Sequence, residues 1–487
     1  MSENDRSDGG FRKPTDFDAF PSSIGYGGKV DPNQATSMGA DPGATSADHP
    51  VQQHPPGGYA MSQMPQMAQG GEIVPPLPRT LEETHLSPSF IAELLVKVLY
   101  FNGEMLGSAV ADYVCLPFSA VVYPLLVQLK EERFVEVKGG TSTYTNTWRF
   151  TLTKAGSEKV QEIMQRNQYC GPAPVSLKDY SQMVNKQFYA AGVTYEDVRH
   201  AFKDLVVADD LVEKVGSAVN SSKSIFLYGP PGNGKTSVAE RICRMQKGSI
   251  YIPYAVEIHG QIIKLYDQLD HHPAEGGAKP PGVYDRRWVY CKRPMVIVGG
   301  ELTLNMLDLT YNESEKFYEA PFQLKSNGGM LLIDDFGRQL VHPKDLLNRW
   351  IVPLEKGIDY LTLHTGQKFE APFRQLVVFS TNMNPRDLVD EAFLRRLRYK
   401  IEVADPTEMN FRNIVRRVCE SKGVMVTDEG LNYLIQNKYR KEQSPFRACH
   451  PRDLVEIILD KARFSKCAPA LDPSFIDTAW SAYFVKY

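Results

Sequence analysis

Hydrophobic and polar positions divide the chain into a polar tail and a longer part with regular apolar spacing. Residues 1–78 hold few apolar clusters and are rich in Gly, Pro, Ser, Gln, Asp and Met. Such a segment cannot bury enough apolar surface to offset the entropy that ordering would remove, so we expect a disordered tail. Ordered structure is predicted to begin near Thr80, where apolar residues start to recur at helical spacing.

Residues 79–167 combine helical spacing with one alternating stretch. Helices are predicted over 87–103, 107–116, 117–134 and 153–165, with a two-stranded hairpin over 134–153. This order resembles a winged helix-turn-helix domain, in which the step TLTKAG from strand into helix is common. Acidic side chains outnumber basic ones here, and the third helix offers mostly Val, Tyr, Leu and Ala before QLKEER. DNA binding needs phosphate neutralisation and polar contacts to bases, so docking onto protein or scaffolding of a ring is favoured over nucleic acid.

The pattern of apolar and polar residues changes twice in the rest of the chain. Residues 168–200 are predicted to form a helical connector. Over 201–404, apolar strands alternate with amphipathic helices, which is typical of an α/β domain with a mostly parallel sheet. Extra material lies between 250 and 327, where RRWVYCKR and PMVIVGGEL are predicted to pair as strands. Residues 405–487 are predicted to form a helical domain.

The stretch SIFLYGPPGNGKTS is a strand followed by the pattern G-x-x-x-x-G-K-T. Glycines in this pattern let the backbone turn so that N–H groups face an anion at the positive end of the next helix. Lys235 can then reach the β- and γ-phosphates of a nucleotide, and the Thr236 hydroxyl can bind Mg²⁺. The predicted phosphate-binding residues are Gly229, Pro230, Pro231, Gly232, Asn233, Gly234, Lys235, Thr236 and Ser237.

About a hundred residues later, GGMLLIDDFG is an apolar strand that ends in two carboxylates. Asp334 is predicted to hold the magnesium together with Thr236, and Asp335 to orient the attacking water. The second acid is an aspartate where most nucleotide hydrolases of this kind have a glutamate. The side chain is therefore shorter by about 1.5 Å, which argues for slow turnover if the backbone lies where it lies in the glutamate enzymes.

The order of these parts resembles an AAA+ ATPase over roughly residues 195–470. The strand and polar end of LVVFSTNMNP resemble the family's sensor 1 strand. This resemblance implies that Asn382 helps to position the attacking water. It also implies a P-loop AAA+ core with a parallel sheet, followed by a helical lid.

Arginine roles follow from the same resemblance. DEAFLRRLRYKIEV resembles the segment that carries arginine fingers, which implies that Arg395 or Arg396 reaches the γ-phosphate held by a neighbouring subunit. Arg398 is a rival, because the spacing departs from the commonest family pattern. CHPRDLVEII resembles the sensor 2 helix of the lid and implies that Arg452 lies over the phosphates.

A narrower resemblance lies in PLEKGIDYLTLHTGQKFEAPFRQLVVFSTN, where a helix and a hairpin precede the sensor 1 strand. This is similar to AAA+ proteins with a pre-sensor 1 hairpin, such as MoxR-type chaperones, chelatase subunits and enhancer-binding activators. None of these groups matches throughout, because the activators' GAFTGA motif and any metal-insertion signature are absent. The chain therefore resembles a MoxR-like or uncharacterised bacterial-type AAA+ group without a settled substrate. The paired aspartates also resemble those of helicase-loader and transposition-helper ATPases.

Composition adds few constraints. The formal net charge of −3 does not indicate a general polyelectrolyte-binding surface, and seven scattered cysteines are typical of reduced thiols in the cytosol. No apolar run is long enough for a membrane span, so we expect a cytoplasmic protein. The predicted function is Mg²⁺-dependent ATP hydrolysis by a homo-oligomeric, ring-forming remodelling protein, which the family's habit would make a hexamer, acting on a protein client. Alternatives are a DNA-associated loader or regulator, and a nucleotide-gated scaffold with little turnover.

Overall fold

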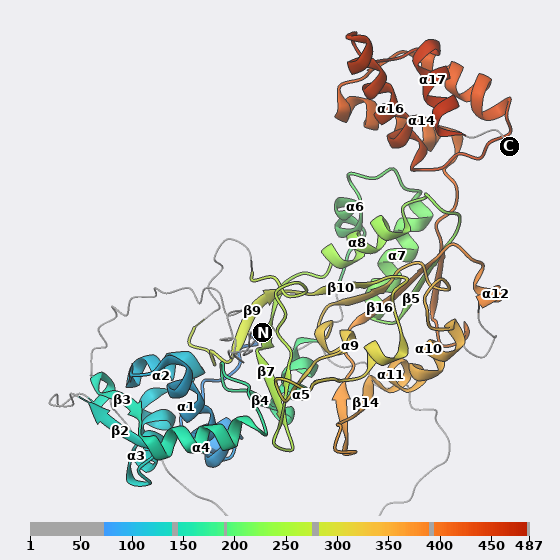
Figure 1. Ribbon diagram of the computed structural model, residues 1–487. Coiled ribbons are helices and arrows are strands. Elements are labelled where there is room, and N and C mark those ends of the chain that lie inside the picture. Colours follow the sequence, from blue (N-terminus) through green and yellow to red (C-terminus); the bar gives the residue numbers. More distant parts are fainter. Residues whose placement is uncertain (1–72, 139–144, 189–191, 275–281, 389–393, 485–487) are drawn as a thin grey trace, which may run out of the picture. The chain divides into compact units, whose positions relative to one another are not determined.

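A computed structural model describes residues 73–138, 145–188, 192–274, 282–388 and 394–484 (Figure 1). Most of the predicted tail therefore lies outside the described residues. At its end, the Pro75 carbonyl accepts a hydrogen bond of 3.0 Å from the Asp285 backbone N–H. Within the described part, no single helix is long and apolar enough to cross a membrane. One pair of helices, Gly107–Val114 and Phe118–Glu131, meets that test jointly, with a bend of 99°.

The amino-terminal ordered segment combines helices with a small antiparallel sheet. Its elements are α1 (Pro88–Asn102), β1 (Met105–Leu106), α2 (Gly107–Val114), α3 (Tyr123–Glu131), β2 (Val135–Lys138), β3 (Arg149–Leu152) and α4 (Lys154–Met164). The hairpin prediction is confirmed by the pairing of β2 with β3. The sequence did not reveal β1, which makes a third strand in the order β1-β3-β2. A π-helical turn, Phe118–Val122, interrupts the predicted third helix. Pro124 is in the first turn of α3, where a proline removes no helical hydrogen bond.

The central sheet has five strands in the order β10-β13-β16-β5-β17, and every pair is parallel. These strands are β5 (Ile225–Tyr228), β10 (Met295–Val298), β13 (Met330–Ile333), β16 (Leu376–Thr381) and β17 (Tyr399–Glu402). Alternate residues face opposite sides. Ile225 and Leu227 belong to the core that includes α7 (Asp209–Ser221) and α8 (Lys235–Arg244), whereas Phe226 packs with Trp350 on the other face.

Helices cover both faces of this sheet, which fits the burial of its three inner strands, β13, β16 and β5 (Figure 1). Besides α7 and α8, they are α6 (Tyr195–Ala201), α9 (Phe322–Lys325), α10 (Pro343–Arg349), α11 (Ile351–Lys356) and the short α12 (Pro385–Leu388). The predicted hairpin before the sensor 1 strand is present as β14 (Ile358–Thr362) and β15 (Lys368–Pro372), an antiparallel pair that follows α11.

A second sheet of five strands was not predicted. Its order is β11-β12-β8-β7-β4, with strands β4 (Val175–Ser176), β7 (Ala255–Ile258), β8 (Gln261–Lys264), β11 (Thr310–Asn312) and β12 (Phe317–Glu319). The strand β4 comes from the predicted connector and pairs with β7, about eighty residues away along the chain. The helix α5 (Leu177–Gln187) follows it and packs in the same core, so the connector contributes to this sheet.

The predicted pairing of RRWVYCKR with PMVIVGGEL was wrong. The strand β9 (Trp288–Lys292) pairs with β6 (Ser249–Pro253), whereas β10 joins the central sheet beside β13. Only Arg293 and Pro294 separate β9 from β10. The favoured two-residue hairpin loops place positive φ at one or both central residues, which suits glycine or asparagine better than the pair Arg293-Pro294. The chain leaves one sheet and enters another at this point.

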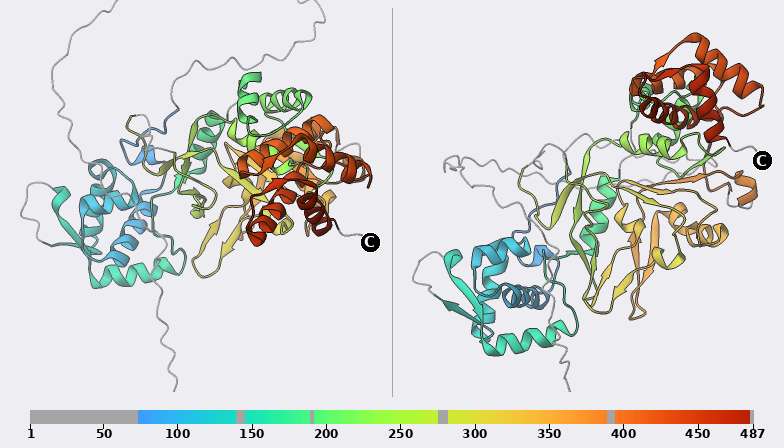
Figure 2. Two further views of the ribbon diagram at one scale, coloured as in Figure 1. Left: turned by 90° about the horizontal axis from the view of Figure 1, so that it is seen from above. Right: turned by 45° about the horizontal axis from the view of Figure 1, so that its top comes forward.

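The carboxyl-terminal segment is helical, as predicted, with a separate hydrophobic core. It contains α14 (Glu408–Lys422), α15 (Asp428–Tyr433), α16 (His450–Ser465) and α17 (Pro473–Tyr483), with a small parallel pair of β18 (Met425–Val426) and β19 (Ala470–Leu471) (Figure 2). Thr407 and Thr427 accept hydrogen bonds from the first turns of α14 and α15, and Gly423 ends α14 with a left-handed backbone.

Candidate functional site

The predicted site residues follow three adjacent strands of the central sheet. Because β13, β16 and β5 are parallel neighbours, their carboxyl ends meet at one edge. The loop 229–237 follows β5, the acidic pair follows β13, and Asn382 follows β16. Open parallel sheets bind ligands outside the carboxyl ends of their strands, so this edge is the candidate site.

The loop takes the conformation that its glycines allow. Gly229, Gly232 and Gly234 have φ of 139°, 80° and 81°, values that side chains with a Cβ rarely adopt. A Cβ on Gly229 would also lie 2.5 Å from the Val403 carbonyl oxygen. The helix α8 begins at Lys235 directly after the loop, so its free N–H groups and the positive end of its dipole lie at the loop.

Lys235 is buried, and its ammonium group donates three hydrogen bonds. The acceptors are the carbonyls of Gly229 at 3.1 Å and Pro230 at 3.0 Å, and Asn382 Oδ1 at 2.6 Å. Burial lowers the pKa of Lys235, while the negative charges of Asp335 and Asp334 raise it. The side chain thus links the loop to the end of β16.

The acidic pair completes a closed set of contacts. Thr236 Oγ1 donates to Asp334 Oδ2 at 2.7 Å, and the Asp335 N–H donates to Asp334 Oδ1 at 3.0 Å. Asn382 Nδ2 donates to Asp335 Oδ1 at 3.1 Å, and its Oδ1 accepts from Lys235. The structure therefore brings Lys235, Thr236, Asp334, Asp335 and Asn382 together.

The turn after β13 is fixed by residues that sequence reasoning missed. Gln339 Nε2 donates to the Asp334 carbonyl at 2.8 Å, and Gln339 Oε1 accepts from the Gly337 N–H at 2.8 Å. Thr381 Oγ1 donates to the Phe336 carbonyl at 2.6 Å. These contacts hold Asp335 in a left-handed conformation, with φ of 48°. The sequence could have indicated Thr381, because it is a polar residue at the end of the apolar strand β16. No pattern in the sequence pointed to Gln339.

Among the predicted finger residues, Arg396 is tied to its own subunit. Its Nε donates to Glu355 Oε1 of α11 at 2.5 Å. Arg395 and Arg398 are exposed. A finger acts on a neighbouring subunit, so their roles stay predictions.

The predicted lid arginine points largely into solvent. The Arg452 side chain is 64% exposed, and its Nε bonds to Asp453 Oδ1 at 3.2 Å. The residues of this segment that do reach the loop come just before α16. The Cys449 N–H donates to the Gly232 carbonyl at 2.8 Å, and Arg447 forms an ion pair with Asp405, which bonds to Asn233. Sequence reasoning missed Arg447 and Asp405.

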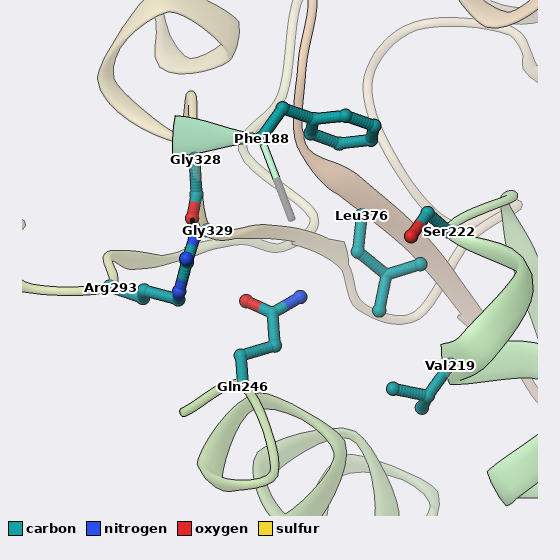
Figure 3. Close-up of a pocket in the computed structure, with 8 residues that line it drawn as sticks. All are labelled: Phe188, Val219, Ser222, Gln246, Arg293, Gly328, Gly329 and Leu376. Carbon is teal, nitrogen blue, oxygen red and sulfur yellow. Dashed lines mark hydrogen bonds between the residues drawn. The ribbon is translucent and has the colours of Figure 1, made fainter. Parts of the chain in front are cut away.

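A small pocket lies near the opposite ends of the strands. It is bordered by residues that precede or begin β13 and β16, among them Gly329 and Leu376, and Figure 3 shows the Gln246 amide between Arg293 and Leu376. Gln246 Oε1 is buried there and has no hydrogen-bond partner among the described residues. None of the residues 229–237 lines this pocket, so it is separate from the candidate site.

A domain of unknown function (DUF8689) matches residues 407–482, within the carboxyl-terminal helices. No curated protein matches the sequence.

Solved structures with some likeness include the ADP complex of NtrX from Brucella abortus, at 13% identity and a TM-score of 0.37, covering 64% of this chain and 59% of NtrX. The RuvB Holliday junction branch migration motor of Thermotoga maritima gives 14% identity and a TM-score of 0.34, covering 57% and 70%. Domain III of the Thermotoga maritima replication initiation protein DnaA gives 13% identity and a TM-score of 0.34, covering 59% and 98%. This chain thus spans less than two thirds of NtrX.

The class of fold follows from the strand order and the loop rather than from these likenesses. A parallel sheet with the phosphate-loop strand between β16 and β17, helices on both faces and a helical segment after β17 define an α/β P-loop fold.

Proposed function

We propose that this protein binds ATP with Mg²⁺ at the loop 229–237 and hydrolyses it, as an oligomeric remodelling ATPase of the MoxR-like type that acts on a protein client. The observation that carries the proposal is the closed set of contacts joining Lys235, Thr236, Asp334, Asp335 and Asn382. A cluster of polar residues that only stabilises the fold could satisfy the same hydrogen-bonding groups. It would not also need a glycine loop with free N–H groups at a helix start.

Phosphate binding is the first step of this proposal. The loop N–H groups and the Lys235 ammonium provide positive charge at one place. Lys235 now bonds to two carbonyls and an amide, which are neutral acceptors. Phosphate oxygens are stronger acceptors for an ammonium because they are charged, so the lysine gains by turning toward them.

The residues beside the loop suit magnesium. Thr236 Oγ1 and Asp334 Oδ2 are hard oxygen donors that lie 2.7 Å apart. Within the described ranges no three side chains of His, Cys, Asp or Glu gather as a metal site, so the ion would take its other ligands from nucleotide and water. Bound there, Mg²⁺ would neutralise charge on the β- and γ-phosphates.

Hydrolysis would use the other two polar residues. Asp335 is exposed and would orient a water toward the γ-phosphate, while the hydrogen bond from Asn382 Nδ2 to Asp335 Oδ1 would hold its carboxylate in place. The backbone position of Asp335 is set by the left-handed turn, which hydrogen bonds from Gln339 and Thr381 stabilise.

Oligomer formation would supply the remaining catalytic group, an arginine from a neighbouring subunit. A trans arginine finger is worth about 10³ to 10⁵ in rate. Arg395 and Arg398 are exposed, and Arg396 bonds to Glu355 of its own subunit. We further propose the five-part division of the chain given by its sequence, with the winged-helix-like segment 79–167 selecting the partner.

Phosphate release measured against protein concentration tests this proposal. Specific turnover should rise with concentration as subunits assemble, and Asp335→Asn should abolish it without preventing ATP binding. Arg398→Ala or Arg395→Ala should lower it by orders of magnitude, while Arg463→Ala, a change on the exposed surface of α16, should not. Turnover that is independent of concentration and survives all of these changes contradicts the proposal. Binding of ATP with negligible turnover in the parent chain would favour the nucleotide-gated scaffold instead.

One observation favours a DNA-associated role as second candidate. The element order α1-β1-α2-α3-β2-β3-α4, with its three-stranded antiparallel sheet, matches the arrangement expected of a winged helix. The end of α3 exposes Glu131 and Glu132, which opposes phosphate contact there. Gel-shift titration at low salt, with single- and double-stranded DNA and with and without ATP, decides between the roles; no retardation removes this candidate.

A further inference from the structure

Two segments that lie far apart in the sequence meet on the phosphate loop. One is Asp405, between β17 and α14, and the other is the turn 447–449 that leads into α16. Both contact the middle of the loop, at Gly232 and Asn233, rather than its ends. The loop therefore contacts the helical segment at two places, before α14 and before α16.

Asn233 is the centre of these contacts. Its Nδ2 donates to Asp405 Oδ1 at 2.7 Å, and its Oδ1 accepts from the Ala448 N–H at 3.2 Å. The side chain is almost fully buried, and both ends of its amide are used. A loop residue that need not touch phosphate thus holds the start of the helical segment and the turn before α16 at once.

Asp405 Oδ1 accepts a second hydrogen bond, from Arg447 Nη1 at 2.5 Å. The Arg447 side chain is 20% exposed and that of Asp405 is 36% exposed, so the ion pair is partly screened by solvent. A partly screened pair opens at small cost when a stronger anion arrives.

Arg447 also lies against the loop itself. A Cβ on Gly232 would lie 2.5 Å from Cys449 Sγ and 3.9 Å from Arg447 Cβ. The positive charge of Arg447 lowers the pKa of Lys235, the lysine expected at the phosphates. Arg452, by contrast, extends into solvent and pairs with its own neighbour Asp453.

We propose that Arg447 is the residue of the helical segment that contacts the nucleotide phosphates, and that Asp405 holds it in the nucleotide-free chain. ATP then competes with Asp405 for the guanidinium group. Binding of nucleotide then releases the contact between Arg447, in the turn before α16, and Asp405, in the segment before α14, and leaves Asn233 bonded to both segments. This inference rests on the proposed ATP binding and names Arg447 as the residue through which bound ATP acts on the helical segment.

The competition predicts opposite effects for the two partners of the ion pair. Arg447→Ala removes a charged hydrogen bond to phosphate and should weaken binding of a non-hydrolysable ATP analogue by about ten- to a hundredfold. Asp405→Asn keeps the oxygen that accepts from Asn233 but removes the competing charge, so it should bind the analogue as tightly as the parent or more tightly. Arg447→Lys should recover part of the lost affinity, because a positive charge remains.

Calorimetric titration of the full chain, with Arg463→Ala on the exposed surface of α16 as matched control, decides the matter. We expect the control to lie within about twofold of the parent. Arg447→Ala within that range, or Asp405→Asn as weak as Arg447→Ala, overturns the inference, because the cluster would then be structural only. If the parent binds no nucleotide, the proposed function itself fails. If the parent binds, Lys235→Ala does not and Arg447→Ala equals the parent, only the present inference fails.

Discussion

Asp335→Glu lengthens the second acid of the pair by one methylene, and we expect it to lower ATP turnover. In the present structure Asn382 Nδ2 lies 3.1 Å from Asp335 Oδ1. The added methylene moves the carboxylate by about 1.5 Å, so this contact either closes to an overlap or is lost. The left-handed backbone, with φ of 48°, suits aspartate better than glutamate and adds a cost of about 1 kcal/mol.

The kinetic loss follows from the displacement. An error of about 1 Å in the position of a catalytic group can cost about a hundredfold in rate. That factor corresponds to about 2.7 kcal/mol of activation free energy. The charge is unchanged and Asp335 is outside the loop, so the affinity for ATP should remain close to that of the parent.

Steady-state phosphate release at saturating ATP, with affinity measured separately by calorimetry, checks this prediction. Asp335→Asn serves as the control that keeps the length and removes the charge. Turnover of Asp335→Glu equal to or above that of the parent would refute the reasoning, because it would mean that the turn adapts and that the short acid is a handicap.

Three further predictions concern stability. Asn327 is buried, and its amide donates to the Tyr180 hydroxyl and the Pro372 carbonyl and accepts from the Arg374 N–H, so Asn327→Ala should lower the free energy of unfolding in urea by about 3 kcal/mol; no loss would contradict the roles given to these bonds. Burial lowers the pKa of Lys97 to about 8 from an unfolded value of 10.5. The unfolded chain therefore binds more protons between these values, and stability should rise with pH across this window. Lys97→Met should flatten that rise and stabilise the chain at neutral pH by up to about 3 kcal/mol; an unchanged slope would contradict this. Burial, aided by the charge of Arg447, lowers the pKa of His450 to about 4, so the folded form holds a neutral imidazole. Stability measured by thermal unfolding should fall as the pH drops from about 6.5 to about 4, and His450→Gln should remove this dependence if the titration of His450 causes it.

The sequence predicted the loop, the acidic pair and Asn382 because each depends on short-range order. Glycine spacing dictates the backbone of the loop, and an apolar strand that ends in polar residues places them at the edge of a parallel sheet. The same reasoning predicted the hairpin β14–β15, in which strand and turn are adjacent in the chain.

Other features depend on contacts between distant residues. The strand β4 is only two residues long and becomes a strand through its pairing with β7. Adjacent apolar stretches favoured a hairpin of β9 with β10, whereas packing on β6 and β13 places them in different sheets. Arg447 and Asp405 look like ordinary surface residues in the sequence, because their role depends on where the turn before α16 meets the loop.

Calorimetric titration of the parent chain and of Lys235→Ala with ATP and magnesium tests the central claim most directly. The Lys235 ammonium is held by Gly229, Pro230 and Asn382 at the candidate site, so we predict saturable heat for the parent and its loss in the variant. Absence of heat with the parent, or equal binding by the folded variant, would contradict the account.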